Sequence, residues 1–164
     1  MTTRIVVMGP SGCGKTTLAR ALALALNWRY VEGDELHPEA NVAKMAAGRP
    51  LDDADRAPWL IRVGEALAAQ PERGVVAACS ALKRKYRDVL RQAAGPVFFV
   101  LPVLPREVLA ERLSHRRGHY MPASLLQSQL ADLEPPAADE DGMTVDGAAS
   151  VLAQIGLIRS TLRR

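Results

Sequence analysis

The clearest candidate for chemistry is the segment 9–16, which reads GPSGCGKT and matches the pattern G-x-x-x-x-G-K-[ST] in full. Glycines at this spacing let successive backbone N–H groups point inward around a phosphate, and a following helix N-terminus adds partial positive charge. Lys15 can then reach the β- and γ-phosphates of a nucleotide, and the Thr16 hydroxyl can be a ligand of Mg²⁺. The segment therefore predicts a phosphate-binding loop that uses ATP and magnesium.

We expect ATP to contact this loop and two arginines farther along the chain. The expected cofactor-binding residues are Gly9, Ser11, Gly12, Cys13, Gly14, Lys15, Thr16, Thr17, Arg112 and Arg116. The thiol of Cys13 could be redox-sensitive, because helix N-termini lower thiol pKa values. We favour a small filler residue, since no second cysteine lies nearby in the sequence to resolve an oxidised thiol. Cys79 lies in an apolar segment and is expected to be buried.

Asp34 is the second candidate, because it follows Gly33 at the end of a short segment that suits a strand. Ligands bind beyond the carboxyl ends of parallel strands, so Asp34 should lie in the same crevice as the phosphate loop. A carboxylate there can accept the proton of an attacking hydroxyl, or hold magnesium together with Thr16. The alternative is that Asp34 is the N-cap of a helix that begins near residue 35.

Arg112 and Arg116 are four residues apart and would share one face of a helix. Such a pair can clamp a phosphoryl group during transfer, which makes Arg116 the third catalytic candidate beside Lys15 and Asp34. A basic helix end that complements its own dipole is the alternative. Gly118 directly follows and could be a hinge, which favours a mobile lid at about 112–134.

The elements that must position these residues alternate between strand and helix. Apolar runs predict strands at 5–8, 30–34, 75–79, 97–103 and 143–145. Helical patterns and their stop signals cover 15–26, 59–70, 81–94, 105–117, 122–133 and 148–162. This alternation predicts an α/β fold with a five-stranded parallel sheet flanked by helices, in one domain that spans residues 1–164.

Composition excludes several classes of protein. The chain has 164 residues and a formal charge of +3, with 4% aromatic residues. A nucleic-acid-binding protein would be expected to gather its basic residues on one face and to offer aromatic rings for stacking, so we expect an anionic small molecule instead. The sequence has no run of about 18 apolar residues that would suit a membrane span. Without a recognisable signal peptide, a cytoplasmic location is expected.

The phosphate loop alone does not specify the reaction. A regulatory GTPase would need an Asn-Lys-x-Asp segment, which the sequence lacks, and an AAA-type ATPase would need a longer chain and an acidic residue after the third strand. What remains is a compact kinase in which a lid supplies arginines. Its acceptor site should offer cations and polar groups in loops beyond the strand ends.

Four segments resemble motifs of the gluconate kinase family. They are the stretch GDELHPEAN at 33–41, the stretch KMAAGRPLDDADRAPWL at 44–60, CSALK at 79–83 with Tyr86, Arg87 and Asp88, and Arg116 with Gly118 and His119. The resemblance extends from the phosphate loop to about Asp146. Two places depart from the family pattern, namely Tyr120, where phenylalanine is usual, and the loop 147–150, which lacks an expected proline. No adenine contacts are therefore assigned to that loop.

The resemblance implies a nucleoside-monophosphate-kinase-like fold, a homodimer, and phosphorylation of D-gluconate at its 6-hydroxyl with ATP and Mg²⁺. The substrate-binding residues that it implies are Asp34, His37, Arg56, Ser80, Lys83, Arg87 and His119. For each of these, a solvated surface position is the alternative. His37 could instead be a structural hydrogen-bonding residue, and Trp59 is expected in the core. Asp52, Asp53 and Asp55 are expected to start a helix rather than to bind a metal.

Two rival functions remain open at this point. The first is a related kinase with another acceptor, such as shikimate or a nucleoside. Shikimate kinases usually carry a Gly-rich turn after the third strand, where this chain has Ser80-Ala81-Leu82. The second is a nucleotide-binding regulatory protein that hydrolyses ATP slowly, which a phosphate loop alone does not exclude.

Overall fold

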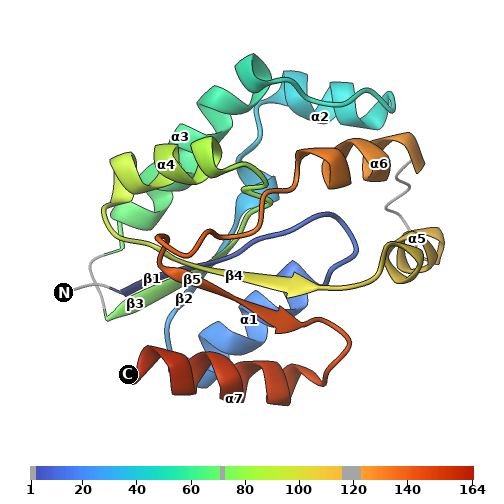
Figure 1. The fold of residues 1–164 in the computed structure, drawn as a ribbon. Coiled ribbons are helices and arrows are strands. Elements are labelled where there is room, and N and C mark those ends of the chain that lie inside the picture. The colour runs from blue at the N-terminus through green and yellow to red at the C-terminus, as the bar shows by residue number, and fades with distance from the viewer. Residues whose placement is uncertain (1–2, 71–72, 116–122) are drawn as a thin grey trace.

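Strands and helices alternate along the chain, as the sequence pattern predicts. The computed structural model describes residues 3–70, 73–115 and 123–164 (Figure 1). The strands are β1 (Thr3–Val7), β2 (Arg29–Glu32), β3 (Gly74–Ala78), β4 (Phe98–Val103) and β5 (Gly142–Asp146). The helices are α1 (Lys15–Leu26), α2 (Glu39–Ala46), α3 (Asp53–Ala68), α4 (Arg84–Ala94), α5 (Arg106–Ser114), α6 (Ala123–Asp132) and α7 (Val151–Leu162), with a short 3₁₀ helix, η1 (Gly33–Leu36).

The strands form one five-stranded sheet in the order β2-β3-β1-β4-β5, and each neighbouring pair is parallel. The predicted α/β fold is therefore confirmed. Because β1 lies between β3 and β4, the phosphate loop that follows it emerges at the middle of the sheet. The loops after β2 and β3 emerge at the same carboxyl edge, which positions Asp34 and Ser80 near the phosphate loop.

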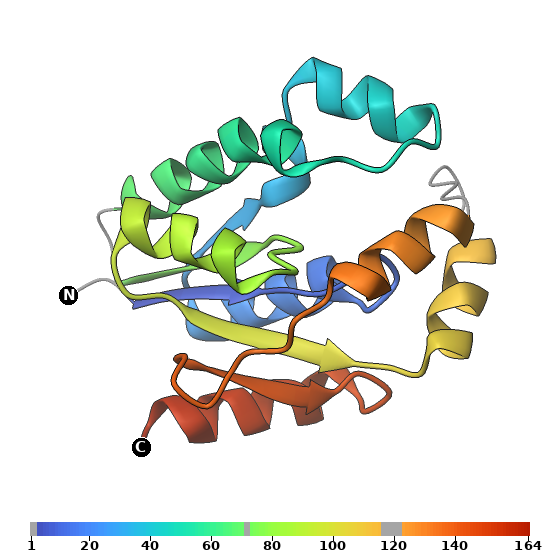
Figure 2. The same ribbon diagram turned by 45° about the horizontal axis from the view of Figure 1, so that its top comes forward.

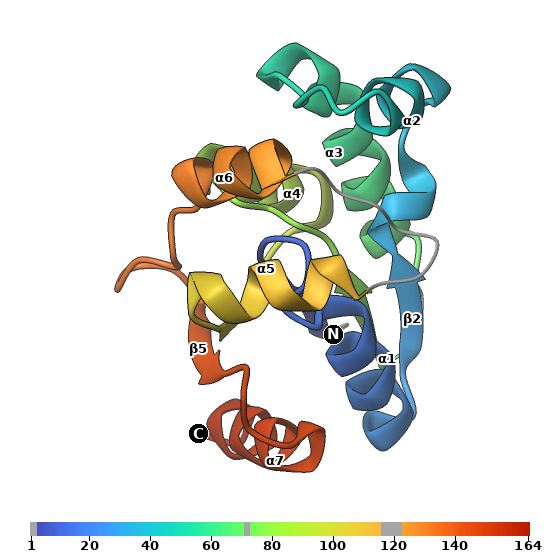
Figure 3. The same ribbon diagram turned by 90° about the vertical axis from the view of Figure 1, so that its right-hand side faces the viewer.

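Two helical layers cover the sheet. One face packs against α3 and α4 through buried side chains such as Trp59, Val63 and Leu90. The other face packs against α1 and α7 through Leu18, Leu22 and Ile158. Figure 1 shows these two layers on opposite sides of the sheet. Viewed toward the carboxyl edge in Figure 3, α5 crosses in front of the strands, with α6 above it and α2 at the upper right.

A third, smaller cluster ties α5 and α6 to the phosphate loop. Cys13 packs there against Leu109 and Leu113 of α5, Leu126 of α6, and Leu104. The side chain of Cys13 is buried, and burial raises the pKa of its thiol. Cys13 is therefore the filler residue that we favoured, and the redox-sensitive alternative loses its physical basis. Cys79 is buried as well, as predicted.

Helix α3 begins at Asp53, six residues before the predicted start at residue 59. A capping box explains the difference: the Asp52 carboxylate accepts from the Asp55 backbone N–H, and the Asp55 carboxylate accepts from the Asp52 N–H. Pro58, which directly precedes the predicted start, lies inside α3. The expectation that the Asp52–Asp55 cluster starts a helix is confirmed.

Candidate active site

The phosphate loop connects the end of β1 to the first turn of α1. Gly9 and Gly14 have positive φ angles of 133° and 88°, which glycine adopts without a steric penalty. At Gly9, a Cβ atom would lie 2.9 Å from the Sγ of Cys13, so glycine is required by space as well. The loop borders a hollow lined by Gly12, Gly14, Lys15, Thr16, Thr17, Asp34 and Arg112.

Two cations reach the loop from different elements. The Lys15 Nζ donates to the carbonyl oxygen of Pro10 at 3.3 Å. Arg112, in the last turn of α5, donates from Nη1 to the carbonyl oxygen of Gly12 at 3.3 Å. Both side chains line the hollow described above, which we call the phosphate hollow. The structure therefore brings together most of the predicted cofactor-binding residues, while Gly9, Ser11 and Cys13 belong to the loop without lining the hollow.

The carboxylate of Glu32 links the two residues predicted to hold magnesium. Its Oε2 accepts from the Thr16 hydroxyl at 2.9 Å, and its Oε1 accepts from the Asp34 backbone N–H at 3.3 Å. Glu32 is thus the N-cap of η1, which is the position that the alternative reading gave to Asp34. The Asp34 side chain instead lines the phosphate hollow.

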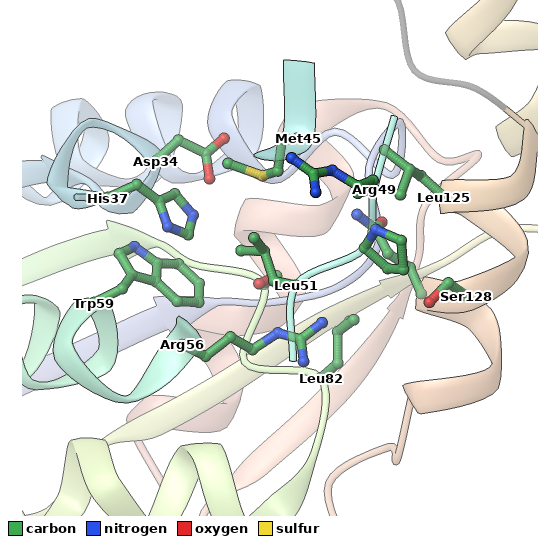
Figure 4. A pocket seen from close by; sticks show the side chains of 13 residues that line it. Asp34, His37, Met45, Arg49, Leu51, Arg56, Trp59, Leu82, Leu125 and Ser128 are labelled. Atoms are coloured by element: carbon green, nitrogen blue, oxygen red, sulfur yellow. The ribbon is translucent and has the colours of Figure 1, made fainter. Parts of the chain in front are cut away.

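A second pocket adjoins the first, and we call it the acceptor pocket. Its lining comes from η1, α2, α3, α6 and the loops after α2 and β3. The lining residues are Asp34, His37, Met45, Arg49, Pro50, Leu51, Arg56, Trp59, Ser80, Leu82, Leu125, Ser128 and Gln129. In Figure 4, Asp34, His37 and Trp59 lie on one side of this pocket, and Arg49, Leu125 and Ser128 lie on the other. Asp34 lines both pockets.

His37 is held as a neutral ring in the acceptor pocket. It stacks on Trp59, with ring centroids 4.1 Å apart. Burial lowers the pKa of His37 below its usual 6.5, against the opposing effect of Asp34. The buried Asn41 donates from Nδ2 to the Asp55 carbonyl oxygen, and the same amino group lies 3.2 Å from Nδ1 of His37. Nδ1 is therefore the acceptor, which leaves the proton on Nε2 as a donor for a ligand.

The cations of Arg56 and Lys83 share the carboxylate of Asp132, and Arg56 also lies 3.8 Å from Asp53. Asp132, the last residue of α6, lies 3.6 Å from Arg56 and 3.7 Å from Lys83. Arg56 also donates from Nη1 to the Tyr86 hydroxyl at 2.9 Å. This arrangement holds two cations beside the acceptor pocket, with Arg56 in its wall.

Comparison with known proteins identifies the family. A family model described as an AAA domain matches residues 5–136. The chain is 54% identical to a gluconokinase of Gluconobacter oxydans over 87% of this chain and 82% of that one. It is 48% identical to a probable gluconokinase of Schizosaccharomyces pombe, over 82% of this chain and 74% of that one. The chain belongs to the gluconokinase family.

Solved structures agree with this gluconokinase assignment. A gluconokinase from Sinorhizobium meliloti 1021 superposes with a TM-score of 0.85 at 46% identity, over 98% of this chain and 95% of that one. A shikimate kinase from Aquifex aeolicus has a TM-score of 0.63 at 17% identity, over 98% of this chain and 96% of that one, which shows a shared fold alone. The short chain and the lack of an acidic residue after the third strand argued against an AAA-type ATPase. The matching family model is described as an AAA domain, and the relatives narrow the family assignment to gluconokinases.

One of the substrate-binding residues implied by the gluconokinase resemblance does not line the acceptor pocket. Arg87 is fully buried, and its guanidinium forms two hydrogen bonds of 2.7 and 2.9 Å with the Glu140 carboxylate. Its Nη1 donates to the carbonyl oxygens of Ala81 and Leu82. The prediction that Arg87 binds substrate is therefore corrected. Arg87 supports the loop after β3, in which Ala81 has a positive φ of 42°.

The structure brings Asp34, His37, Arg56 and Ser80 together in the acceptor pocket, with Lys83 beside it. Two further predicted site residues, Arg116 and His119, lie outside the described residues. The same holds for Gly118, the predicted hinge, and for Tyr120.

Three side chains at the candidate site were not predicted from the sequence, namely those of Glu32, Gln129 and Asp132. Glu32 ends the same strand that pointed to Asp34, so the strand-end argument could have included it. Leu125, Ser128, Gln129 and Asp132 have spacings of three and four residues, which place them on one helical face. That spacing was visible in the sequence, but what the face contacts was not.

Proposed function

We propose that the protein transfers the γ-phosphoryl group of ATP to the 6-hydroxyl of D-gluconate, giving 6-phosphogluconate and ADP. The observation that carries this proposal is the position of Asp34, which lines both the phosphate hollow and the acceptor pocket. A group at the junction of two sites can act on an atom that passes from one to the other. The relatives named gluconokinase support gluconate as the acceptor.

In the proposed reaction, the 6-hydroxyl oxygen attacks the γ-phosphorus as the bond from that phosphorus to the β–γ bridging oxygen breaks. The Asp34 carboxylate takes the hydroxyl proton, and ADP leaves. Lys15 and Arg112 stabilise the charge on the phosphate oxygens, because both line the phosphate hollow. Arg56 supplies donors for the gluconate carboxylate, and the Nε2–H of neutral His37 donates to a gluconate hydroxyl.

The phosphate hollow suits magnesium that arrives with ATP. Thr16 and Asp34 offer oxygen ligands there, and magnesium prefers such ligands while it keeps several waters. Among the described residues, no group of three or more His, Cys, Asp or Glu side chains forms a dedicated metal site. Magnesium held by Thr16, Asp34 and the nucleotide would neutralise negative charge on the phosphates.

We further propose that residues 1–164 form one domain with a mobile lid at about 112–134. Two contacts from this segment support a lid role: Arg112 reaches Gly12, and Gln129 reaches Ser11, both in the phosphate loop. Arg116 and His119 belong to this proposed lid. A homodimer and a cytoplasmic location are proposed from the family resemblance. No helix in the described ranges is long and apolar enough to cross a membrane.

The proposed function is tested by ADP release with D-gluconate, shikimate, nucleosides and no acceptor, followed by identification of the product. We expect turnover to require D-gluconate and to yield 6-phosphogluconate. Turnover with shikimate or a nucleoside in place of gluconate would contradict the proposed acceptor. Slow ATP hydrolysis that no acceptor stimulates would favour a regulatory protein.

A further inference from the structure

Gln129 of α6 contacts the phosphate loop and the acceptor pocket at the same time. Its Oε1 accepts a hydrogen bond of 2.7 Å from the backbone N–H of Ser11, 118 residues earlier in the chain. The same side chain lines the acceptor pocket together with Leu125 and Ser128 of the same helix. Gln129 therefore lies where the two sites adjoin, as Asp34 does from η1. Figure 2 shows α6 above the carboxyl edge of the sheet, apart from η1 in the chain and in space.

The bond between Gln129 and Ser11 does not compete with phosphates. The phosphate hollow is lined by Gly12, Gly14 and the residues that begin α1, and Ser11 is not among them. The N–H of Ser11 is therefore engaged outside the phosphate hollow. When ATP fills the hollow, Gln129 can keep its hydrogen bond.

The chemistry of the amide then defines what Gln129 offers. Its oxygen accepts from an N–H, so the other amide atom must be the Nε2 amino group, which carries two donors. Nε2 makes no hydrogen bond with any residue in the ranges 3–70, 73–115 and 123–164, although the side chain lines a pocket. An amide anchored at its oxygen, with its donors unused, suits a ligand that is rich in hydroxyl oxygens.

Buried neighbours on α6 orient this amide when the helix is packed on the phosphate loop. Leu126, three residues before Gln129, is buried in the cluster with Cys13 of the phosphate loop and Leu113 of α5. Leu125 is buried as well. A polar side chain on a helix with buried neighbours is positioned more accurately than one on a loop.

Building on the proposed function, we propose that Gln129 contacts the acceptor. Its Nε2 donates to an oxygen at the reacting end of gluconate, opposite the Asp34 carboxylate, and so holds the 6-hydroxyl beside the γ-phosphate. Its Oε1 stays on Ser11, which fixes the acceptor's distance from the phosphate loop. Gln129 thereby also favours transfer to gluconate over transfer to water.

Three variants test this contact. Gln129→Glu keeps an acceptor for the Ser11 N–H but removes both donors. Gln129→Met keeps the length of the side chain, removes both groups and adds no charge. Gln127→Glu is the matched control, because residue 127 is exposed on the same helix and receives the same change of charge. The measurements are kcat and KM for gluconate, the affinity for ATP, and the amount of 6-phosphogluconate formed per ADP.

We expect both Gln129 variants to lose about tenfold or more in kcat/KM for gluconate, the worth of one hydrogen bond to a polar ligand. The yield of 6-phosphogluconate per ADP should fall, because water then competes with a poorly held hydroxyl. Affinity for ATP should change less than twofold, and Gln127→Glu should match the wild type in every measurement.

Wild-type kinetics and yield in Gln129→Glu would overturn the proposal, since the bond to Ser11 would then be the whole role of Gln129. An equal loss of gluconate-dependent turnover and of gluconate-independent ATP hydrolysis would also overturn it, because the defect would lie in ATP use. Failure of the proposed function can be told apart from failure of the Gln129 proposal, because the wild type itself would then show no turnover that depends on gluconate. The product yield of the same variants with the acceptor found in the panel would then decide the role of Gln129.

Discussion

The Thr16 hydroxyl donates a hydrogen bond of 2.9 Å to the carboxylate of Glu32 at the end of β2. The same carboxylate accepts from the Tyr30 hydroxyl and from the Asp34 backbone N–H. Burial, together with Glu32, raises the pKa of Tyr30 to about 12, so its hydroxyl remains a donor. Because Thr16 gives its proton to Glu32, the lone pairs of its oxygen are left for a cation.

Glu32→Gln should therefore weaken magnesium use. The amide cannot accept from Thr16, Tyr30 and Asp34 as a carboxylate does, so the Thr16 hydroxyl loses its fixed orientation. We expect the Mg²⁺ concentration for half-maximal turnover to rise about tenfold or more, as when a partner of a metal ligand is lost. The exposed Glu65 of α3 provides the control, Glu65→Gln, which should leave this concentration unchanged. Identical magnesium curves for Glu32→Gln and the wild type would contradict the positioning role.

Lys15→Ala should reduce phosphoryl transfer by several orders of magnitude in a protein that still folds. The physical reason is the loss of the cation that lines the phosphate hollow, where charge moves during transfer. Steady-state turnover with gluconate measures the loss, and thermal unfolding verifies the fold. Near-normal turnover would show that the loop does not carry the reaction.

Asp34→Asn should lower kcat about a hundredfold or more, within the range for general-base catalysis. Asparagine keeps the shape of the side chain but removes the charge and the basicity at the junction of the two pockets. Repeating the assay over a range of Mg²⁺ concentrations separates two roles, because only loss of a metal ligand should be partly rescued by high magnesium. If Asp34→Asn retains most of its gluconate-dependent turnover, the base lies elsewhere.

His37 should set the acid limit of gluconate use. Burial lowers its pKa below 6.5, so the ring is neutral at pH 7 and protonates only in more acidic solution. Protonation would put a hydrogen on Nδ1, which now accepts from Asn41, and disturb the pocket. We expect kcat/KM for gluconate to stay level as the pH falls to 6.5 and to decline only below it.

The same shift has a consequence for stability. As the pH falls, the His37 ring binds its second proton first in the unfolded chain. The contribution of neutral His37 to the free energy of unfolding is therefore present above pH 6.5 and is lost below it. His37→Gln should remove this dependence from urea unfolding curves measured across the pH range. In the kinetic experiment on the wild type, an inflection of kcat/KM at or above pH 6.5 would contradict the assignment of the acid limit to His37.

The pair formed by Arg87 and Glu140 should matter for stability. Glu140→Gln leaves the guanidinium buried without its counterion, which typically costs about 3–5 kcal/mol of unfolding free energy. The control is Asp139→Asn, which breaks an exposed bidentate pair with Arg84. Exposed pairs contribute about 0–1 kcal/mol, so chemical unfolding should separate the two variants clearly. Equal costs would contradict the structural role of Arg87.

The buried pair also predicts sensitivity to acid. Hydrogen bonds from Arg87 hold the pKa of Glu140 well below its usual 4.5. The contribution of this pair to the free energy of unfolding is complete above pH 4.5. It is lost as the pH falls below that value, because the unfolded chain takes up the proton first. Urea unfolding of the wild type should show this loss below pH 4.5, and Glu140→Gln should show a smaller loss.

Local chemistry by itself determined the phosphate loop, the alternation of strands and helices, and the placement of Asp34. These follow from patterns within about 10–20 consecutive residues, such as glycine spacing and hydrophobic period. The start of α3 was placed at residue 59, although the Asp52–Asp55 cluster was expected to start a helix, and the capping box of Asp52 and Asp55 moves the start to Asp53.

Only the tertiary structure decided which of the polar residues face a ligand. Arg87 and Arg56 are both arginines near motifs, yet one is buried against Glu140, 53 residues away, and the other lines the acceptor pocket. The contact of Gln129 with Ser11 spans 118 residues in the same way. Whether a charge is paired depends on which segments pack together, and partners this distant in the chain leave no local pattern that could reveal them.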